Sequence, residues 1–305
     1  MEFLDHIANY PKRGFEQKES FMSGRRIILS MVVCTIVCLF VTSAAQAQGR
    51  MYNTAKQKLM EGKQIVGGTV TTSDPNIYCS MANSGFDYTW IEMQHSPLTY
   101  SDTAKMIWAC RGATAVPFIR VPDATEGDIQ KATDIGALGI IVPMVRTVEE
   151  AELAVQYLKY PPLGRRSRGG GQYRALWGDD YRETWNDNSM LVIMIESPAG
   201  VAMADKIAAV PGVDVVFAAS GDLGSFTGWE RTDPRYEALV KNIHDDTLKA
   251  GKKLGGPYAW KDRPGFSFFQ GASEGALIRS GASAALGGSS SQSSNEATGD
   301  EPRRR

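Results

Sequence analysis

The sequence has few of the residues on which several classes of site depend. Its 305 residues include four Cys and three His, so neither a disulfide scaffold nor a His-rich zinc site is expected. Lys and Arg number 33 against 34 Asp and Glu, and the net charge of −1 excludes a nucleic-acid binder that acts through bulk basicity. No G-x-G-x-x-G turn follows the first predicted strand, which argues against a dinucleotide-binding sheet. A metal site in this chain must therefore rely mainly on carboxylates.

Long apolar runs are also absent. The longest, IILSMVVCTIVCLF at 27–40, has 14 residues, fewer than the roughly 20 that span a bilayer comfortably. A pair of Arg precedes it and A-Q-A ending at Ala47 follows, a pattern typical of a cleaved signal peptide. We interpret 1–47 as an upstream extension plus a signal peptide. The mature protein is then exported, periplasmic or secreted, with no membrane attachment after cleavage. An uncleaved N-terminal membrane anchor is the alternative.

The remainder divides into one domain and a tail. Residues 287–305 are rich in Ser and Gly and almost without apolar side chains, which predicts a disordered tail. The mature part keeps Cys79 and Cys110, and their spacing alone does not establish whether they pair. The folded domain is predicted to span 48–286.

Short β-rich runs alternate with helical patterns along this domain. The predicted strands are 65–71, 88–93, 116–120, 139–143, 191–195, 213–218, 253–256 and 266–270. The predicted helices are 75–84, 100–111, 126–135, 148–159, 198–210 and 234–250, with weaker ones near Trp260 and at 273–280. Several strands are apolar without alternation, as expected for strands buried on both faces. Eight such units favour an α/β fold, the (β/α)8 TIM barrel, over an open doubly wound sheet.

A barrel of this kind carries its chemistry where the strands end. Glu92 and His95 follow the second predicted strand, Arg120 ends the third, Glu196 follows the fifth and Asp222 the sixth. Two carboxylates on successive strand ends suit Mg²⁺ or Mn²⁺, with Co²⁺ as another possibility. We therefore predict Glu196 and Asp222 as metal ligands; the alternative is that each carboxylate caps the next helix.

The other strand-end groups have predicted roles around that metal. His95 is the candidate general base, with Glu92 orienting it. Arg120 is expected to stabilise an oxyanion or to bind a substrate carboxylate. The alternative is a structural ion pair with an acid such as Asp134, and both can hold at once. We expect the turn at Ser220 and Gly221 to contact substrate.

One further stretch is basic, Gly-rich and aromatic. It spans 160–177, and a single such loop on a neutral protein does not indicate nucleic-acid binding. A lid or rim over an acidic substrate, or a subunit contact, is the preferred interpretation.

Six motifs together resemble one enzyme family. They are G-F-D-Y-T-W-I-E-M-Q-H-S-P at 85–97, P-F-I-R-V-P at 117–122, D-I-G-A-L-G-I-I-V-P-M-V at 134–145, Y-P-P-L-G-R-R at 160–166, I-E-S-P-A-G at 195–200 and P-G-V-D-V-V-F-A-A-S-G-D-L at 211–223. In this order, the motifs resemble the HpcH/HpaI aldolases, metal-dependent class II pyruvate aldolases of 4-hydroxy-2-oxo acids.

The resemblance implies a fold, a reaction and a set of residues. It implies a (β/α)8 barrel in a homo-oligomer, usually a hexamer, that acts on pyruvate and an aldehyde. Metal ligation falls on Glu196 and Asp222, proton transfer on His95 and enolate stabilisation on Arg120. The aspartate of the family's D-x-G motif falls on Asp134, which joins the catalytic candidates.

The chain departs from the family pattern at several positions. The family usually has Asp at Glu92, Glu at Gln94 and Gln at Met194, and its G-P-x-D-L turn is A-S-G-D-L in this chain. Two alternatives to an aldolase follow. One is another lyase of the wider superfamily, such as one acting on coenzyme A thioesters. The other is an exported, non-catalytic oxo-acid-binding protein.

Overall fold

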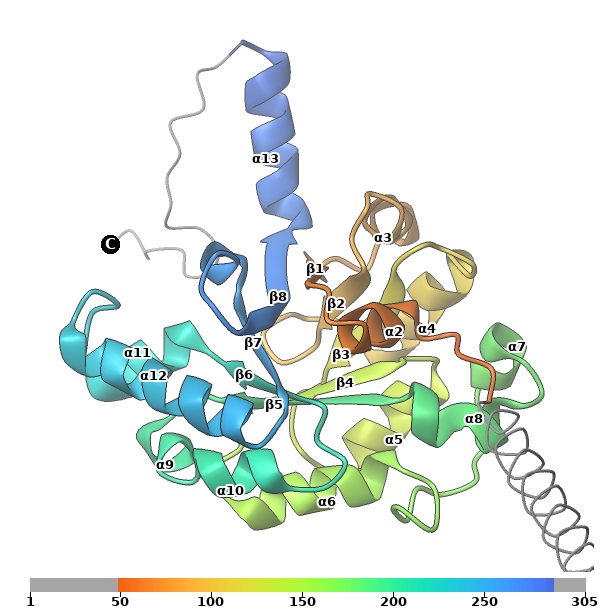
Figure 1. The fold of residues 1–305 in the computed structure, drawn as a ribbon. Coiled ribbons are helices and arrows are strands. Elements are labelled where there is room, and N and C mark those ends of the chain that lie inside the picture. Colours follow the sequence, from red (N-terminus) through yellow and green to blue (C-terminus); the bar gives the residue numbers. More distant parts are fainter. Residues whose placement is uncertain (1–48, 288–305) are drawn as a thin grey trace, which may run out of the picture. The chain divides into compact units, whose positions relative to one another are not determined.

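A computed structural model describes residues 49–287 of the chain. These residues form a closed barrel of eight parallel strands that follow one another around the barrel in sequence order (Figure 1). The strands are β1 (Ile65–Val70), β2 (Tyr88–Glu92), β3 (Val116–Arg120), β4 (Gly139–Val142), β5 (Met190–Ile195), β6 (Val215–Ala218), β7 (Lys253–Pro257) and β8 (Phe266–Ser273). The predicted TIM barrel is confirmed. The predicted signal segment at 1–47, and all but the first residue of the predicted tail, lie outside the described residues.

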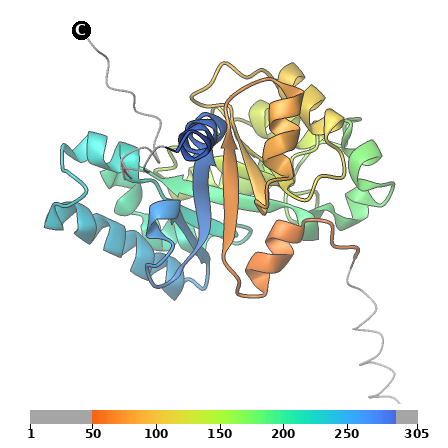
Figure 2. The same cartoon turned by 90° about the horizontal axis from the view of Figure 1, so that it is seen from above.

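Helices connect the strands and surround them (Figure 2). They are α2 (Thr54–Met60), α3 (Pro75–Ala82), α4 (Tyr100–Ala109), α5 (Glu126–Asp134), α6 (Val148–Leu158), α7 (Tyr173–Trp177), α8 (Tyr181–Asn188), α9 (Pro198–Val201), α10 (Ala204–Ala209), α11 (Ser220–Thr227), α12 (Pro234–Lys249) and α13 (Glu274–Ala285), with a 3₁₀ turn, η1 (Tyr258–Trp260). Between residues 49 and 287, no helix is long and apolar enough to cross a bilayer.

The helices differ from the predictions in several regions. The sequence did not predict α2 and α11, and α13 continues to Ala285, beyond the predicted 273–280. The helix predicted at 198–210 is two helices, α9 and α10, because Met203 (φ −114°, ψ 8°) leaves helical geometry between them. The predicted loop at 160–177 ends in α7, and α8 follows before β5. Both regions are connections whose course is set by packing on the barrel, so local sequence pattern alone did not predict their breaks.

Large aromatic rings fill the barrel interior, and glycines on neighbouring strands make room for them. Phe118 on β3 is the register partner of Gly139 on β4, and Tyr88 on β2 is the partner of Gly67 on β1. A Cβ atom on either glycine would lie 2.2 Å from the partner's ring. The interior is therefore a packed core below the site, and it supports the residues at the strand ends.

A disulfide connects the first two helices of the barrel wall. Cys79 on α3 and Cys110, directly after α4, are bonded, with their Cα atoms 5.3 Å apart. The spacing of these cysteines did not establish whether they pair, and in the structure they form a disulfide. It closes a loop of 31 residues that contains β2 and the loop that follows it.

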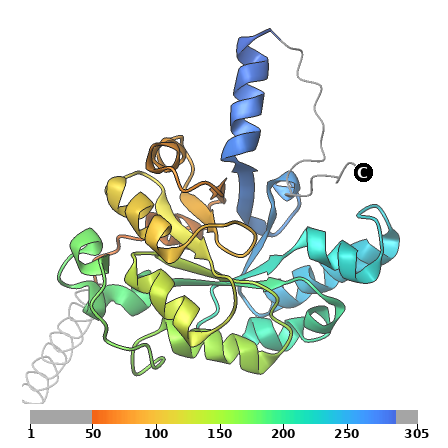
Figure 3. The same ribbon diagram turned by 180° about the vertical axis from the view of Figure 1, so that it is seen from behind.

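The last helix, α13, extends away from the barrel along the direction of β8 (Figures 1 and 3). Its only buried residue is Glu274 at its start. The Glu274 Oε1 atom accepts hydrogen bonds from the backbone N–H of Thr71 and of Thr72, at 2.7 and 2.8 Å. Ile278 is 59% exposed, so α13 presents apolar side chains that the described part of the chain does not cover.

Candidate active site

Glu92 and Arg120 form a buried ion pair at the ends of neighbouring strands. They are register partners on β2 and β3, so their side chains leave the barrel wall at the same level and on the same side. The Arg120 Nε atom donates to Glu92 Oε2 at 2.5 Å, and the two side chains are only 10% and 4% exposed. The ion pair that sequence reasoning offered for Arg120 with Asp134 is instead made with Glu92.

Trp90 supports this ion pair from below. It lies two residues before Glu92, so both side chains point into the barrel, where the Trp90 ring lies 5.3 Å from that of Phe217. The Trp90 Nε1–H donates to Glu92 Oε2 at 3.1 Å, and the Arg120 guanidinium carbon lies 5.7 Å from the indole centroid. Trp90 is a positioning residue that sequence reasoning missed. Its signal was the two-residue spacing from Glu92 in W-I-E.

The loop after β2 carries His95 and is held by the second oxygen of Glu92. Glu92 Oε1 accepts the backbone N–H of Gln94 at 2.9 Å and that of His95 at 3.0 Å. Glu92 therefore positions the backbone of the loop that carries His95. The sequence analysis predicted instead that Glu92 orients the His95 imidazole. His95 is exposed and follows the end of β2.

Glu196 follows β5 and is 1% exposed. Its Oε2 atom accepts the backbone N–H of Met144 at 2.5 Å, and Met144 has the left-handed φ of 58°, which costs a non-glycine residue about 1–2 kcal/mol. Burial raises the pKa of Glu196 to about 7. The Met144 N–H and Arg120 oppose the rise, while the nearby carboxylates of Asp222 and Glu92 add to it.

Asp222 lies in the first turn of α11, which begins where β6 ends. Ser220 is buried and its carbonyl accepts the Tyr236 hydroxyl at 3.2 Å, while Gly221 beside it faces open space. The helix-capping alternative for the two carboxylates is wrong, because the N-cap residues of α9 and α11 are Ser197 and Ala219.

The oxygen atoms at this end of the barrel fit a hard divalent cation. Among the described residues, no group of three or more His, Cys, Asp and Glu side chains is placed to hold a metal. Glu196 and Asp222 are close enough for the Asp222 carboxylate to raise the pKa of Glu196, and their role as metal ligands stays a prediction. Mg²⁺ is typically bound by one or two carboxylates, with water or substrate oxygens completing its shell. In the loop after β2, the buried Gln94 Oε1 has no hydrogen-bond partner.

Asp134 lies at the other end of the barrel. It ends α5, which returns from the end of β3 to the start of β4, and it binds Arg166 Nη2 at 2.9 Å and Gln130 at 2.8 Å. The structure does not bring it together with Glu92, Arg120 and Glu196, and its catalytic role stays a prediction.

The basic loop at 160–177 lies at that same end. The Arg166 side chain is fully buried among four aromatic rings, with its guanidinium carbon 4.5 Å from the Trp185 centroid and 4.8 Å from that of Tyr160. A loop anchored beside Asp134 does not cover the strand ends, so the lid interpretation is wrong. The subunit-contact interpretation stays a prediction.

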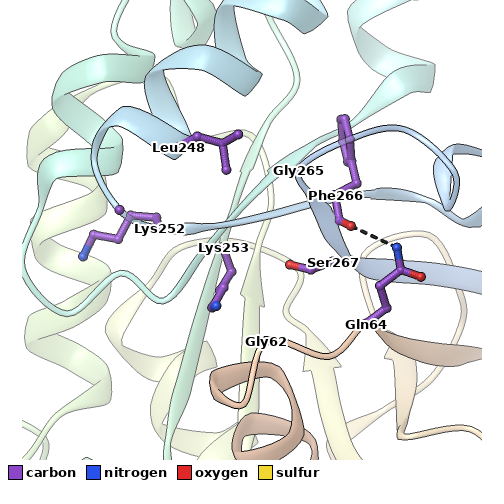
Figure 4. A pocket seen from close by; sticks show the side chains of 9 residues that line it. Gly62, Gln64, Leu248, Lys252, Lys253, Gly265, Phe266 and Ser267 are labelled. Carbon is purple, nitrogen blue, oxygen red and sulfur yellow. Dashed lines mark hydrogen bonds between the residues drawn. The ribbon is translucent and has the colours of Figure 1, made fainter.

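A further cavity has a volume of about 490 Å³, and Figure 4 shows the side chains that line it. It is lined by residues at the starts of three strands, among them Gln64 before β1, Lys253 on β7 and Ser267 on β8. The Gln64 side chain donates to the Phe266 carbonyl at 3.3 Å. In a TIM barrel this end contributes to stability, and catalysis takes place at the other.

Comparison with known proteins identifies the family. The model of the HpcH/HpaI aldolase/citrate lyase family matches residues 70–259, which is more than half of the chain and includes all of the site residues described above. The chain belongs to the HpcH/HpaI aldolase/citrate lyase family. It is thus an enzyme of the aldolase type, a carbon–carbon lyase, and the family's enzymes depend on a divalent metal.

Several relatives illustrate the range of this family. The chain is 35% identical over 180 residues to the hydroxypyruvate/pyruvate aldolase of Chromohalobacter salexigens, which covers 57% of this chain and 71% of the relative. It is 30% identical over 208 residues to the 2-keto-3-deoxy-L-rhamnonate aldolase of Salmonella gallinarum, covering 67% and 78%.

Solved structures agree with this assignment. An HpcH/HpaI aldolase/citrate lyase family protein from Burkholderia cenocepacia superimposes with a TM-score of 0.71 at 25% identity, covering 77% of this chain and 98% of that one. The citrate synthase SbnG superimposes with a TM-score of 0.67 at 30% identity, covering 77% and 96%.

Proposed function

We propose that this member of the family cleaves or forms a 4-hydroxy-2-oxo acid through the enolate of pyruvate. The observation that carries the proposal is the arrangement around Glu196, a buried carboxylate with a raised pKa, next to Asp222 and near the Arg120 guanidinium. Mg²⁺ or Mn²⁺, or alternatively Co²⁺, is the cofactor proposed for the two carboxylates. Such an ion supplies a Lewis acid that binds oxygens of the oxo acid.

The protein's own groups have separate tasks in this reaction. Arg120, held in place by Glu92, donates hydrogen bonds to the oxygen that becomes negative when the enolate forms. The backbone of Ser220 and Gly221 borders the open space beside Asp222 and is proposed to contact the substrate. These groups are assembled before substrate arrives, because their partners hold them at the strand ends.

His95 is proposed to move the protons. In cleavage, it removes the proton of the 4-hydroxyl as the C3–C4 bond breaks, which releases the aldehyde and leaves the pyruvate enolate. A proton is then returned to C3, so that pyruvate is formed and the protons balance. An exposed imidazole at the mouth of the barrel suits exchange of protons with both substrate and water.

Aldol addition to pyruvate tests this proposal. Pyruvate is incubated with a panel of aldehydes and with Mg²⁺, Mn²⁺ or Co²⁺, and adducts are detected by mass spectrometry. Glu196→Gln is expected to lower the rate by about 10²-fold or more, because loss of the Lewis acid removes several kcal/mol of stabilisation. Glu61→Gln, at the end of α2, is the matched control and should retain full activity. Calorimetric binding of pyruvate without turnover of any aldehyde would favour the non-catalytic alternative.

We further propose that the mature protein is exported. The Cys79–Cys110 disulfide supports this, since disulfides persist in oxidising compartments and are rare in the cytosol. Expression of the full chain, followed by cell fractionation and N-terminal sequencing, is expected to find the mature protein outside the cytoplasm and beginning at Gln48. A cytoplasmic protein that retains its first 47 residues would overturn this.

A homo-oligomer is the third part of the proposal, with a hexamer expected from the family. The projecting helix α13 supports it, since Leu277 and Ile278 are 37% and 59% exposed and exposed apolar faces of this kind mark contact surfaces. Light scattering should find a multimer for the full chain, and Ile278→Glu should reduce its mass. A monomeric full chain would contradict the proposal.

A further inference from the structure

Met194 places a thioether beside the Arg120 guanidinium. Its Sδ atom lies 4.0 Å from Arg120 Nη1, and the residue is 2% exposed. On β5 it stands two positions before Glu196, so both side chains project to the inner side of the barrel wall. Any ligand oxygen that Arg120 Nη1 binds therefore has Met194 as a neighbour.

The other contacts of Arg120 leave this direction free for a ligand. The Nε atom is bound to Glu92 Oε2 at 2.5 Å, and the Trp90 ring lies below the guanidinium. A thioether sulfur is only a weak hydrogen-bond acceptor, so Nη1 keeps most of its capacity for an anionic oxygen. Trp90 and Met194 each contribute apolar surface beside the Arg120 guanidinium.

We propose that Met194 selects the nucleophilic substrate of this aldolase, favouring pyruvate, whose C3 is a methyl group, over 3-hydroxypyruvate. This inference rests on the proposed function, in which Arg120 holds the oxygen on C2. Because C3 is bonded directly to C2, a substituent on C3 lies close to Met194. A methyl group packs well against a thioether, whereas a hydroxyl buried there gives up its water without gaining a good partner.

The expected size of this selectivity follows from the chemistry of apolar pockets. An apolar wall rejects an added hydroxyl by about 10²-fold at most, so pyruvate should react about 10- to 100-fold faster. An amide at this position would offer the hydroxyl both a donor and an acceptor. Met194→Gln is therefore expected to shift the ratio of the two substrates about tenfold or more toward hydroxypyruvate.

The test follows exchange of the C3 hydrogens with solvent. The full-length protein with Mg²⁺ is incubated in D₂O with pyruvate and hydroxypyruvate together, and NMR measures how fast each C3–H becomes C3–D. The exchange needs no aldehyde, and the ratio of the two rates in one sample is independent of the fraction of folded protein. Met194→Leu, which keeps an apolar side chain of similar size, is the matched variant and should keep the wild-type ratio.

The ratio of the pyruvate to the hydroxypyruvate exchange rate is compared among the wild-type protein and the two variants. A wild-type ratio of 10 or more that falls in Met194→Gln and persists in Met194→Leu supports the proposal. Equal rates in the wild-type protein, or the same ratio in all three proteins, overturn it. If neither substrate exchanges, the proposed function has failed, and competitive calorimetry of the two acids with Mg²⁺ then decides whether Met194 discriminates in binding; equal affinities overturn the selectivity as well.

Discussion

At the scale of single residues, the site depends on charged groups whose partners are buried and specific. Glu92 accepts four hydrogen bonds, from the Trp90 indole, the Arg120 guanidinium and the backbone N–H groups of Gln94 and His95. One carboxylate thus connects the barrel interior, the Arg120 guanidinium and the loop that carries His95. Loss of any one donor should change the others' positions, because hydrogen bonds to a buried charge are among the strongest in a protein.

Trp90→Phe tests this connection. The variant keeps an aromatic ring in the interior but loses the Nε1–H that binds Glu92, so kcat should fall about tenfold, the equivalent of one hydrogen bond to a charged group. Calorimetric affinity for Mg²⁺ should change little, since Glu196 and Asp222 are not touched. Trp185→Phe is the control, because it also loses an indole hydrogen bond, to the Leu158 carbonyl, at the opposite end. Equal losses of kcat in both variants would show that Trp90 acts only on folding.

The raised pKa of Glu196 makes a prediction about pH. Its pKa is about 7 in the folded protein against an ordinary value of 4.5, so the folded state holds the proton more tightly. The resulting stabilisation is fully present below pH 4.5 and is lost as pH rises to 7, by roughly 3 kcal/mol. Urea unfolding of metal-free protein at pH 5 and pH 7.5 measures the loss.

Glu196→Gln is the control for this measurement. The neutral amide cannot ionise, so the pH-dependent loss should be smaller in the variant by the contribution of Glu196. Added Mg²⁺ should offset the loss at pH 7.5 in the wild-type protein, since a bound cation compensates the ionised carboxylate. An identical change with pH in both proteins would refute the assignment.

At the scale of elements, register between strands decides which side chains meet. Glu92 faces Arg120, and Phe118 faces Gly139, because β2, β3 and β4 pair in one fixed register. A change of bulk at a paired glycine must therefore displace the partner's ring. The interior rings in turn support Trp90 and, through it, the site.

Gly139→Ala measures this packing. The added Cβ would lie 2.2 Å from the Phe118 ring, and the variant should lose about 1–3 kcal/mol of unfolding free energy. Gly127→Ala is the control, since its Cβ on α5 would meet nothing within 4 Å and alanine favours a helix by about 1 kcal/mol. In urea unfolding, the free energy of unfolding should therefore fall in Gly139→Ala and rise in Gly127→Ala. Equal stability of Gly139→Ala and the wild-type protein would contradict the packing described.

The sequence predicted the elements better than their contacts. All eight strands were predicted, because buried apolar runs between turns are a strong local signal, and the strand-end rule located Glu92, Arg120, Glu196 and Asp222. Contacts between side chains on different strands leave no comparable pattern in the local sequence. The partner of Arg120 and the support from Trp90 depend on register, and the position of Asp134 depends on which end of the barrel its helix reaches.

Two irregular features could not be predicted from the local sequence, because they too depend on contacts between distant segments. The left-handed Met144 lies in a loop with no glycine signal, yet its N–H is directed at Glu196. Glu274 anchors α13 to the end of β1 through Thr71 and Thr72, residues about 200 positions earlier in the chain. Both arrangements exist only once the barrel has closed.

At the scale of the molecule, the two ends of the barrel have different tasks. The end where the strands finish gathers the carboxylates, Arg120 and His95. At the opposite end, the buried Arg166 side chain packs among four aromatic rings and forms an ion pair with Asp134, and these contacts stabilise that end of the barrel. The disulfide between α3 and α4 crosslinks the wall next to β2.

The central claim is that Glu196 and Asp222 hold the metal on which carbon–carbon bond cleavage depends. It is tested most directly by following pyruvate release from a 4-hydroxy-2-oxo acid with lactate dehydrogenase as the coupling enzyme. The account predicts release with Mg²⁺ or Mn²⁺, loss of release with EDTA, and little release by Glu196→Ala at any metal concentration. Metal-stimulated release that survives in Glu196→Ala at the wild-type rate would contradict it.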